Sequence, residues 1–126
     1  MVAPANPRET TMQYLLMIYG DETAMQGRSK AEVDQVVGAF MAYTEAMKSA
    51  GVLVGSNRLR PTSTATTVRV AAGKTQVLNG PYAETKEQLG GYYLIEAPDL
   101  DAALSWASRC PGAAFGSIEV RPIWQM

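Results

Sequence analysis

The order of segments along the chain predicts an α+β fold, a ferredoxin-like plait of the form βαβ–hairpin–βαβ. Short apolar segments alternate with two segments of helical periodicity, and a glycine turn joins two short strands in the middle of the chain. Helical crossovers within one sheet are right-handed, so both helices are expected on one face. The first strand is apolar on both sides, which predicts that the face without helices is also covered.

The first strand is expected over Met12–Tyr19 and ends at Gly20-Asp21-Glu22. Its side chains form two apolar sets on opposite faces, which are Tyr14, Leu16 and Ile18, and Leu15, Met17 and Tyr19. The helices cover only one of these sets, and a monomer rarely exposes so large an apolar patch. Packing against a second copy is the simplest cover, so the sequence predicts a homodimer.

The first helix is expected to begin at the capping box Ser29-Lys30-Ala31-Glu32 and to end before Gly51. Its inner stripe recurs at helical spacing and consists of Val33, Val36, Val37, Phe40, Thr44 and Met47. An extended segment over 52–59 follows the helix, with Gly55-Ser56-Asn57 inside it and Pro61 beyond its end.

A hairpin is expected from strands over 66–71 and 75–78, which turn at Ala72-Gly73. The next strand is expected over Tyr92–Ala97. The second helix has Asp99 as its cap and is closed by Pro111-Gly112, and the last strand runs over Ser117–Ile123. The inner stripe of this helix consists of Leu100, Ala103, Leu104 and Ala107.

Length and composition indicate one domain. The chain has 126 residues, and a chain of this size buries roughly two-thirds of the surface of its unfolded form, so it needs no disulfide or metal to fold. Pro4 and Pro7 lie in a segment that is typical of a loose terminal arm. We therefore expect a flexible arm over residues 1–11 and a single domain over 12–126.

The same composition excludes several classes of protein. The 11 basic and 12 acidic residues nearly cancel, which argues against direct binding to nucleic acid. No apolar run approaches the ~20 residues of a membrane span. Met1–Thr10 lacks the pattern of a secretory signal and Cys110 has no second cysteine to pair with, so we expect a cytoplasmic protein. Without histidine, the commonest general base and metal ligand is missing, and we expect neither metal nor cofactor.

The turn Asn79-Gly80-Pro81-Tyr82 is the first candidate site. Asn-Gly tolerates positive φ and proline fixes its own φ at about −65°, so the loop is rigid. Glu84 follows in a charged run. The functional interpretation is a loop that holds an amide and a carboxylate at the mouth of a cleft. The alternative is a tight turn whose asparagine side chain bonds its own backbone.

Arg58 and Arg60 are a second candidate, because alternate positions on a strand point to one face and two guanidinium groups together bind a carboxylate or phosphate. The alternative is an exposed edge strand guarded by charge. Gly90-Gly91 allows close approach of either a ligand or another strand.

Three further features carry weaker expectations. Tyr19 and Asp21 lie at the end of the first strand, and sheets with parallel strands often bind ligands beyond such ends, although Asp21 also suits an ordinary turn. Cys110 stands at the wrong end of a helix to be activated and is expected to be a buried small apolar group. The serines and threonines over 62–67 have no histidine to activate them as nucleophiles.

The segment from Asn79 to Glu87 resembles the signature of the DGPF branch of the YCII-related proteins. That signature is Asp-Gly-Pro-Phe followed by Ala-Glu-Thr-Lys-Glu, and here Asn79 takes its first position and Tyr82 its fourth. The resemblance covers nearly the whole chain after residue 11, including the segments over 14–21 and 99–103. It implies a dimeric α+β barrel and an association with extracytoplasmic-function sigma factors.

The family's proposed histidine–aspartate dyad has no counterpart here. The chain contains no histidine, and the amide of Asn79 cannot act as a general base. The sequence therefore predicts a homodimeric small-molecule-binding protein with little or no catalysis. Its expected ligand contacts are Asn79, Gly80, Pro81, Tyr82, Glu84 and Arg58. Two alternatives stay open: a lyase or hydrolase with Glu84 as base and Arg58 as stabiliser, and a regulatory partner of a sigma factor.

Overall fold

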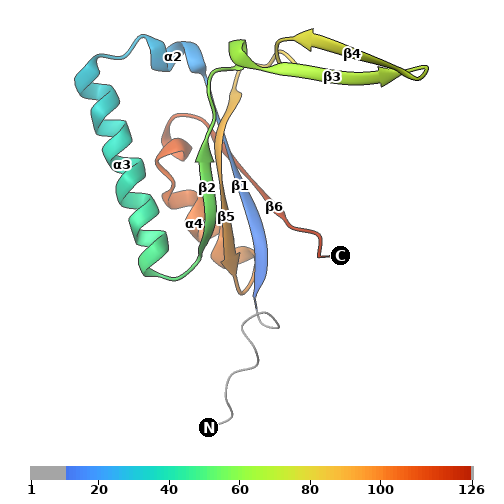
Figure 1. Cartoon of the computed structure of the whole chain (residues 1–126). Helices are drawn as coiled ribbons and strands as arrows, with labels where there is room; N and C mark the ends of the chain where they lie inside the picture. The colour runs from blue at the N-terminus through green and yellow to red at the C-terminus, as the bar shows by residue number, and fades with distance from the viewer. Residues whose placement is uncertain (1–10, 126) are drawn as a thin grey trace.

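The computed structural model describes residues 11–125 as an α+β fold. The loose arm expected over residues 1–11 lies outside the described residues, apart from Thr11. Four strands form the main sheet, in the order β2-β5-β1-β6 (Figure 1). They are β1 (Met12–Gly20), β2 (Leu53–Arg58), β5 (Gln88–Ala97) and β6 (Ser117–Pro122).

All neighbouring strands of this sheet are antiparallel. Since β1 and β2 are each antiparallel to β5, they run in the same direction with β5 between them. Among the described residues, the sheet therefore has no directly paired parallel strands. The intervening strand β5 supplies backbone hydrogen bonds to both β1 and β2. The ligand position suggested at Tyr19 and Asp21 stays a prediction.

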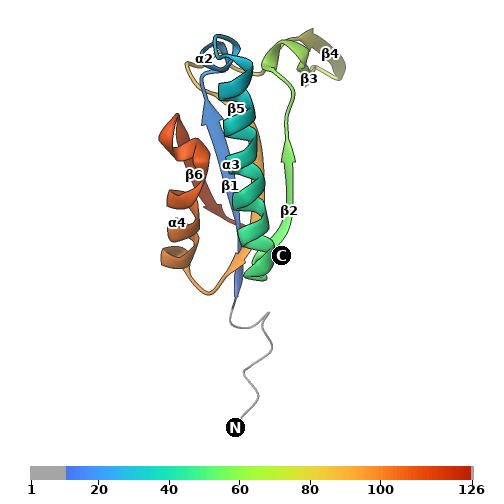
Figure 2. The same cartoon turned by 90° about the vertical axis from the view of Figure 1, so that its left-hand side faces the viewer.

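The two long helices, α3 (Lys30–Ser49) and α4 (Leu100–Arg109), cover one face of the sheet (Figure 2). The capping box predicted for α3 is confirmed: the Ser29 hydroxyl accepts a hydrogen bond from the Glu32 N–H at 3.2 Å, and Glu32 Oε1 accepts one from the Ser29 N–H. The Asp99 cap of α4 is also confirmed, because its carboxylate accepts from the Ala102 N–H at 2.8 Å. Each helix thus begins where its capping residue predicts.

The core lies between this face and the helices. It consists of Tyr14, Leu16, Tyr43, Met47, Tyr93, Ile95, Ala97, Ala103, Ala107 and Cys110. Cys110 is buried, as expected. The Tyr43 hydroxyl donates to the Trp106 carbonyl oxygen at 2.7 Å, and the Tyr43 ring stands edge-on to Tyr93 at 5.2 Å between centroids. Tyr43 therefore joins both helices and the sheet, a role that helical spacing did not reveal.

Some positions of the expected helix stripes are exposed. Leu100 and Leu104 of α4 are 46% and 45% exposed, and Val37 of α3 is 37% exposed. The small residues Ala103 and Ala107 face the sheet instead. Because alanine lets α4 approach the sheet closely, the buried stripe of this helix is narrower than its leucines suggested.

Short helices and a longer strand were not foreseen in the sequence. The helix α2 (Glu22–Gln26) begins at Asp21, whose carboxylate accepts hydrogen bonds from the Thr23 N–H and hydroxyl. The 3-10 turns η1 (Thr62–Thr64) and η2 (Pro111–Ala114) follow β2 and α4. Strand β5 begins at Gln88, ahead of the expected start at Tyr92. Its extra residues pair with the end of β1 through a bulge, in which Ile18 faces Gly91 and Tyr19 faces Leu89.

A two-stranded hairpin of β3 (Thr66–Ala71) and β4 (Lys74–Asn79) projects from the sheet on the side opposite α3 (Figure 1). The predicted turn is confirmed, with positive φ at both Ala72 and Gly73. At the base of the hairpin, the Gly80 N–H donates to the Ala65 carbonyl oxygen at 2.7 Å. No helix within residues 11–125 is long and apolar enough to cross a bilayer.

Candidate functional site

The first half of the candidate loop is exposed. Asn79 ends β4, Gly80 takes a φ of 117°, and the loop then runs through Pro81 to Glu84 on the surface. The Tyr82 side chain is 80% exposed, and the Arg69 guanidinium lies 5.9 Å from the centre of its ring. The positive φ at Gly80 supports the turn interpretation of the Asn-Gly pair. The role of this half of the loop in binding stays a prediction.

The second half of the loop is fixed by its own side chains. Gln88 Nε2 donates to the Thr85 carbonyl oxygen at 2.6 Å, and Gln88 Oε1 accepts from the Glu22 N–H at 3.0 Å. The Thr85 hydroxyl donates to the Glu87 carbonyl oxygen. Glu87 Oε1 in turn accepts from the Ser117 hydroxyl at 2.8 Å. These bonds anchor the loop to α2 on one side and to β6 on the other.

The Glu22 side chain extends this anchoring to the base of the hairpin. Its carboxylate accepts from the Thr62 N–H at 2.7 Å and from the Thr62 hydroxyl at 2.8 Å. Both bonds are partly shielded from water, and bonds to a charged acceptor are among the stronger ones in proteins. Through Glu22, the segment that leads into β3 and the segment that leads into β5 are held by the same short helix.

Beside the anchored loop lies an open depression of about 640 Å³, which we call the Lys86 depression. It is lined by Tyr19, Thr85, Lys86, Glu87, Ser117, Ile118 and Glu119. Three segments meet there: the end of β1, the loop before β5, and the start of β6. Gly116 allows this meeting, because a Cβ atom at that position would collide with the Tyr19 carbonyl oxygen.

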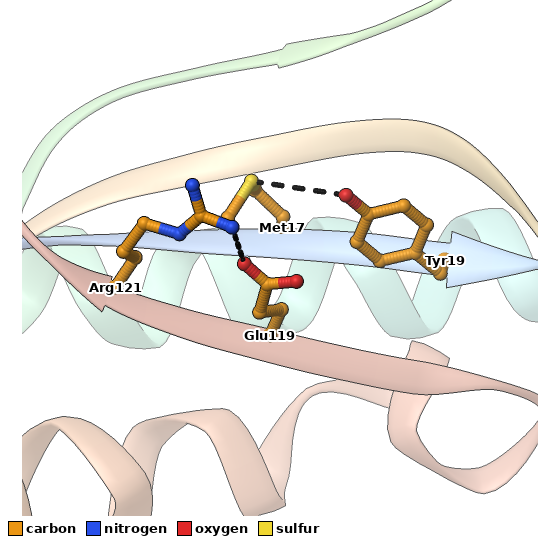
Figure 3. A network of polar contacts seen from close by, with 4 residues as sticks. All are labelled: Met17, Tyr19, Glu119 and Arg121. Carbon is orange, nitrogen blue, oxygen red and sulfur yellow. Dashed lines mark hydrogen bonds and ion pairs between the residues drawn. The ribbon is translucent and has the colours of Figure 1, made fainter. Parts of the chain in front are cut away.

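Several polar groups of the depression already have partners. Glu119 forms an ion pair with Arg121, and Glu87 is bonded to Ser117. Among residues 11–125, the Tyr19 hydroxyl has only the Met17 sulfur at 4.0 Å as a partner, and a thioether is a weak acceptor (Figure 3). Within residues 11–125, the ammonium group of Lys86 has no ion-pair partner. Among the described residues that line the depression, Lys86 and Tyr19 therefore have the fewest polar contacts.

The groups with shifted pKa values lie outside the Lys86 depression, in the core and at helix caps. Burial raises the pKa of Tyr43, Tyr93 and Cys110 in the core. The hydrogen bonds from Thr23 lower the pKa of Asp21, the cap of α2. The bonds from Ser29 likewise lower the pKa of Glu32 in the capping box. None of these groups lines the Lys86 depression.

Arg58 lies at the end of β2 and is exposed, as is Arg60 beyond it. Its strand position faces Gly91 of β5. A Cβ atom on Gly91 would lie 2.8 Å from the Asn57 carbonyl oxygen. The close approach of β2 therefore explains why this position is a glycine. Among the described residues, no hydrogen bond or ion pair joins Arg58 to the loop that holds Tyr82 and Glu84.

A smaller hollow of about 350 Å³ lies at the opposite end of β1, lined by Thr11, Gln13, Glu96 and Gln125. It offers amides and a carboxylate but no cation. No cluster of three or more potential metal ligands occurs over residues 11–125. The Lys86 depression is therefore the stronger candidate for a small-molecule site.

The sequence predicted only some of the residues that line the Lys86 depression. It singled out Tyr19 and the charged run that contains Lys86, but it assigned the ligand contacts to earlier loop residues. Ser117 and Glu119 were missed, because their proximity to the loop arises from the pairing of β6 with β1. The available signal was the alternation of β6, which sends Ser117, Glu119 and Arg121 to the face opposite Ile118 and Val120.

Two comparisons with known proteins bear on the chain. A family model described as the YCII-related domain matches residues 12–126. A protein of Rhizobium meliloti (strain 1021), described as uncharacterised, is 43% identical over 114 residues, which span 89% of this chain and 92% of the relative. The match to the family model covers all seven residues that line the Lys86 depression.

Proposed function

Since the chain belongs to the YCII-related family, we propose that it is a homodimer that binds a small anionic molecule in the Lys86 depression, with little or no catalysis. The observation that carries the proposal is the lining itself. Lys86 contributes an ammonium group without an ion-pair partner among residues 11–125, and the Tyr19 hydroxyl has only a thioether as acceptor. A carboxylate or phosphate is an acceptor that suits both kinds of donor.

The neighbouring carboxylates set the size and orientation of the ligand. Glu119 pairs with Arg121, whereas the Ser117 hydroxyl orients Glu87 and leaves its charge in place. Their negative charge repels a second anionic group, which favours a ligand with one charged end.

The expected contacts Asn79, Gly80, Pro81, Tyr82, Glu84 and Arg58 stay part of the proposal as outer contacts. Tyr82 and Glu84 belong to the same loop as Lys86 and are exposed. Glu84 is not among the residues of the described chain that line the depression. The alternative of a lyase or hydrolase with Glu84 as base therefore has no supporting contact, and we favour binding.

The dimer follows from the sheet face that carries no helix. Leu15 and Met17 of β1 and Tyr92 and Leu94 of β5 alternate with the core residues and are half-buried without a covering element. Two such faces packed together give a dimeric α+β barrel, and the strand order β2-β5-β1-β6 is that of a ferredoxin-like plait. The dimeric barrel and the ferredoxin-like plait are part of the proposal. So is membership of the DGPF branch, which residues 79–87 suggest.

A thermal-shift screen tests the binding proposal. A library rich in small carboxylates and phosphates is applied to the wild type, to Lys86→Met and to Tyr19→Phe. A ligand at 100 times its dissociation constant adds about 2.7 kcal/mol and raises the midpoint by several degrees. We expect a hit that both variants lose. The control is Lys30→Met, which removes an exposed lysine at the start of α3 and leaves the shift unchanged. A hit retained in Lys86→Met contradicts the assignment.

A further inference from the structure

We infer that the β3–β4 hairpin is a docking arm whose valine face packs against a second copy of this chain. The inference rests on the homodimer of the proposed function but concerns a different contact. The hairpin pairs only with itself, as a separate two-stranded sheet. A two-stranded hairpin is marginally stable in water by itself, so this one gains from a partner.

The three valines of the hairpin lie on one of its faces. Val68 and Val77 are directly opposite each other across the ladder, and Val70 lies two residues along β3. These valines are 61%, 60% and 64% exposed, respectively. The other face carries Arg69, Lys74 and Gln76 beside Leu78. Such a segregation of apolar from polar side chains is typical of a surface that is covered on one side.

The direction of the hairpin supports a second copy as its partner. It projects from the sheet on the side that carries no helix (Figure 1), and the perpendicular view agrees (Figure 2). Six-residue strands reach about 20 Å, and two packed sheets are about 10 Å apart. A second copy whose sheet packs on the helix-free face therefore lies within the reach of the hairpin. The valine face would then contact the side or edge of that copy.

The base of the hairpin is held firmly enough for it to act as a preformed arm. Glu22 binds Thr62 just before β3, and the Thr67 hydroxyl donates to the Gly80 carbonyl oxygen at 2.8 Å. The Gly80 N–H closes the base on Ala65. Because these bonds limit its swing, the hairpin loses little conformational freedom on docking.

The dimer dissociation constant, measured by sedimentation equilibrium, tests the inference. In Val68→Thr/Val70→Thr/Val77→Thr, threonine keeps the shape and strand preference of valine but adds a hydroxyl. We expect the dissociation constant of this variant to be at least about tenfold higher than that of the wild type, since each 1.4 kcal/mol of lost binding free energy is a factor of ten. The control Lys74→Thr/Gln76→Thr changes the opposite face and is expected to leave the constant unchanged. Circular dichroism verifies that both variants fold.

Photo-crosslinking tests the same contact with a single valine replaced. A benzoylphenylalanine introduced at Val77 is irradiated in a mixture of nitrogen-15-labelled and unlabelled protein. We expect crosslinks between labelled and unlabelled chains. Crosslinks confined to one chain, or an unchanged dissociation constant in the triple variant, overturn the inference. If the triple valine variant dimerises like the wild type but Met17→Lys does not, the docking role of the hairpin is overturned and the proposed dimer is kept. A wild-type monomer overturns the arm and the proposed dimer together.

Discussion

Glu22 and Gln88 are 66 residues apart in the chain, yet the Glu22 N–H donates to Gln88 Oε1 at 3.0 Å. This bond makes α2 the junction between two loops. One is the loop that lines the Lys86 depression, which Gln88 holds through the Thr85 carbonyl oxygen. The other leads into the hairpin, which the Glu22 carboxylate holds through Thr62. The geometry of the depression and the direction of the hairpin thus depend on the same few residues.

Replacing Gln88 by methionine removes both bonds while keeping the length of the side chain. We expect a loss of about 1–3 kcal/mol in the free energy of unfolding, because the Glu22 N–H loses its partner in a partly buried place. The Thr85 carbonyl oxygen is exposed and contributes less, since water can replace its partner. Hydrogen exchange at residues 85–88 is expected to accelerate. The matched control is Gln76→Met on exposed β4, which should leave both quantities unchanged. Equal exchange in the two variants would contradict the anchoring role.

The adjacent glycines of β5 are predicted to differ sharply in their tolerance of alanine. A Cβ atom on Gly91 meets the Asn57 carbonyl oxygen at 2.8 Å, whereas the nearest atom to one on Gly90 is 3.9 Å away. Gly91→Ala is expected to cost about 1–3 kcal/mol by forcing β2 and β5 apart. Gly90→Ala should cost well under half as much. Chemical denaturation of the two variants compares them, and equal midpoints would show that the close approach of β2 does not explain Gly91.

Stability is predicted to fall at alkaline pH. Burial raises the pKa of Tyr43 and Tyr93 above 10.0 and that of Cys110 above 9.0, so the folded state keeps protons that the unfolded state releases. The stabilisation is complete below pH 9 and is lost as the pH rises through these values, by up to about 1.4 kcal/mol per pH unit for each group. Denaturation midpoints measured from pH 8 to pH 11 test this. Tyr43→Phe should flatten the decline, and an unchanged slope would contradict the assignment.

The dimer predicted for the helix-free face depends on Met17. Met17→Lys places a charge among half-buried apolar side chains and is expected to weaken dimerisation at least about a hundredfold. Met41→Lys is the control, because Met41 is 68% exposed on α3, away from that face. Sedimentation equilibrium of both variants decides the matter. A Met17 variant that dimerises like the control would exclude this face as the interface.

Local signals made much of the fold predictable. The Ser29 and Asp99 caps, the Ala72-Gly73 turn and the strand periodicities each depend on neighbours within a few residues. The helix α2 has no comparable signal, because its five residues contain no buried side chain. Its stability comes from partners such as Gln88 that are distant in the sequence, and local patterns do not report such partners.

The candidate site was less predictable for the same reason. Tyr19, Lys86 and Ser117 come from three segments that are distant in the sequence. The pairing of β6 with β1 brings Ser117 next to Tyr19, and this pairing is not visible in local sequence patterns. The side chains of Thr85, Glu87 and Gln88 hold the loop. Lys86 stands between them, and within the described chain it has no ion-pair partner.

Amide shifts of the nitrogen-15-labelled protein, recorded by NMR during titration with a screening hit, test the central claim most directly. The account predicts that the largest shifts occur at Tyr19, Thr85–Glu87 and Ser117–Glu119, and that Lys86→Met abolishes them. Shifts centred instead on the hollow beside Gln13 and Glu96, or spread along the hairpin, would contradict the assignment of the ligand to the Lys86 depression.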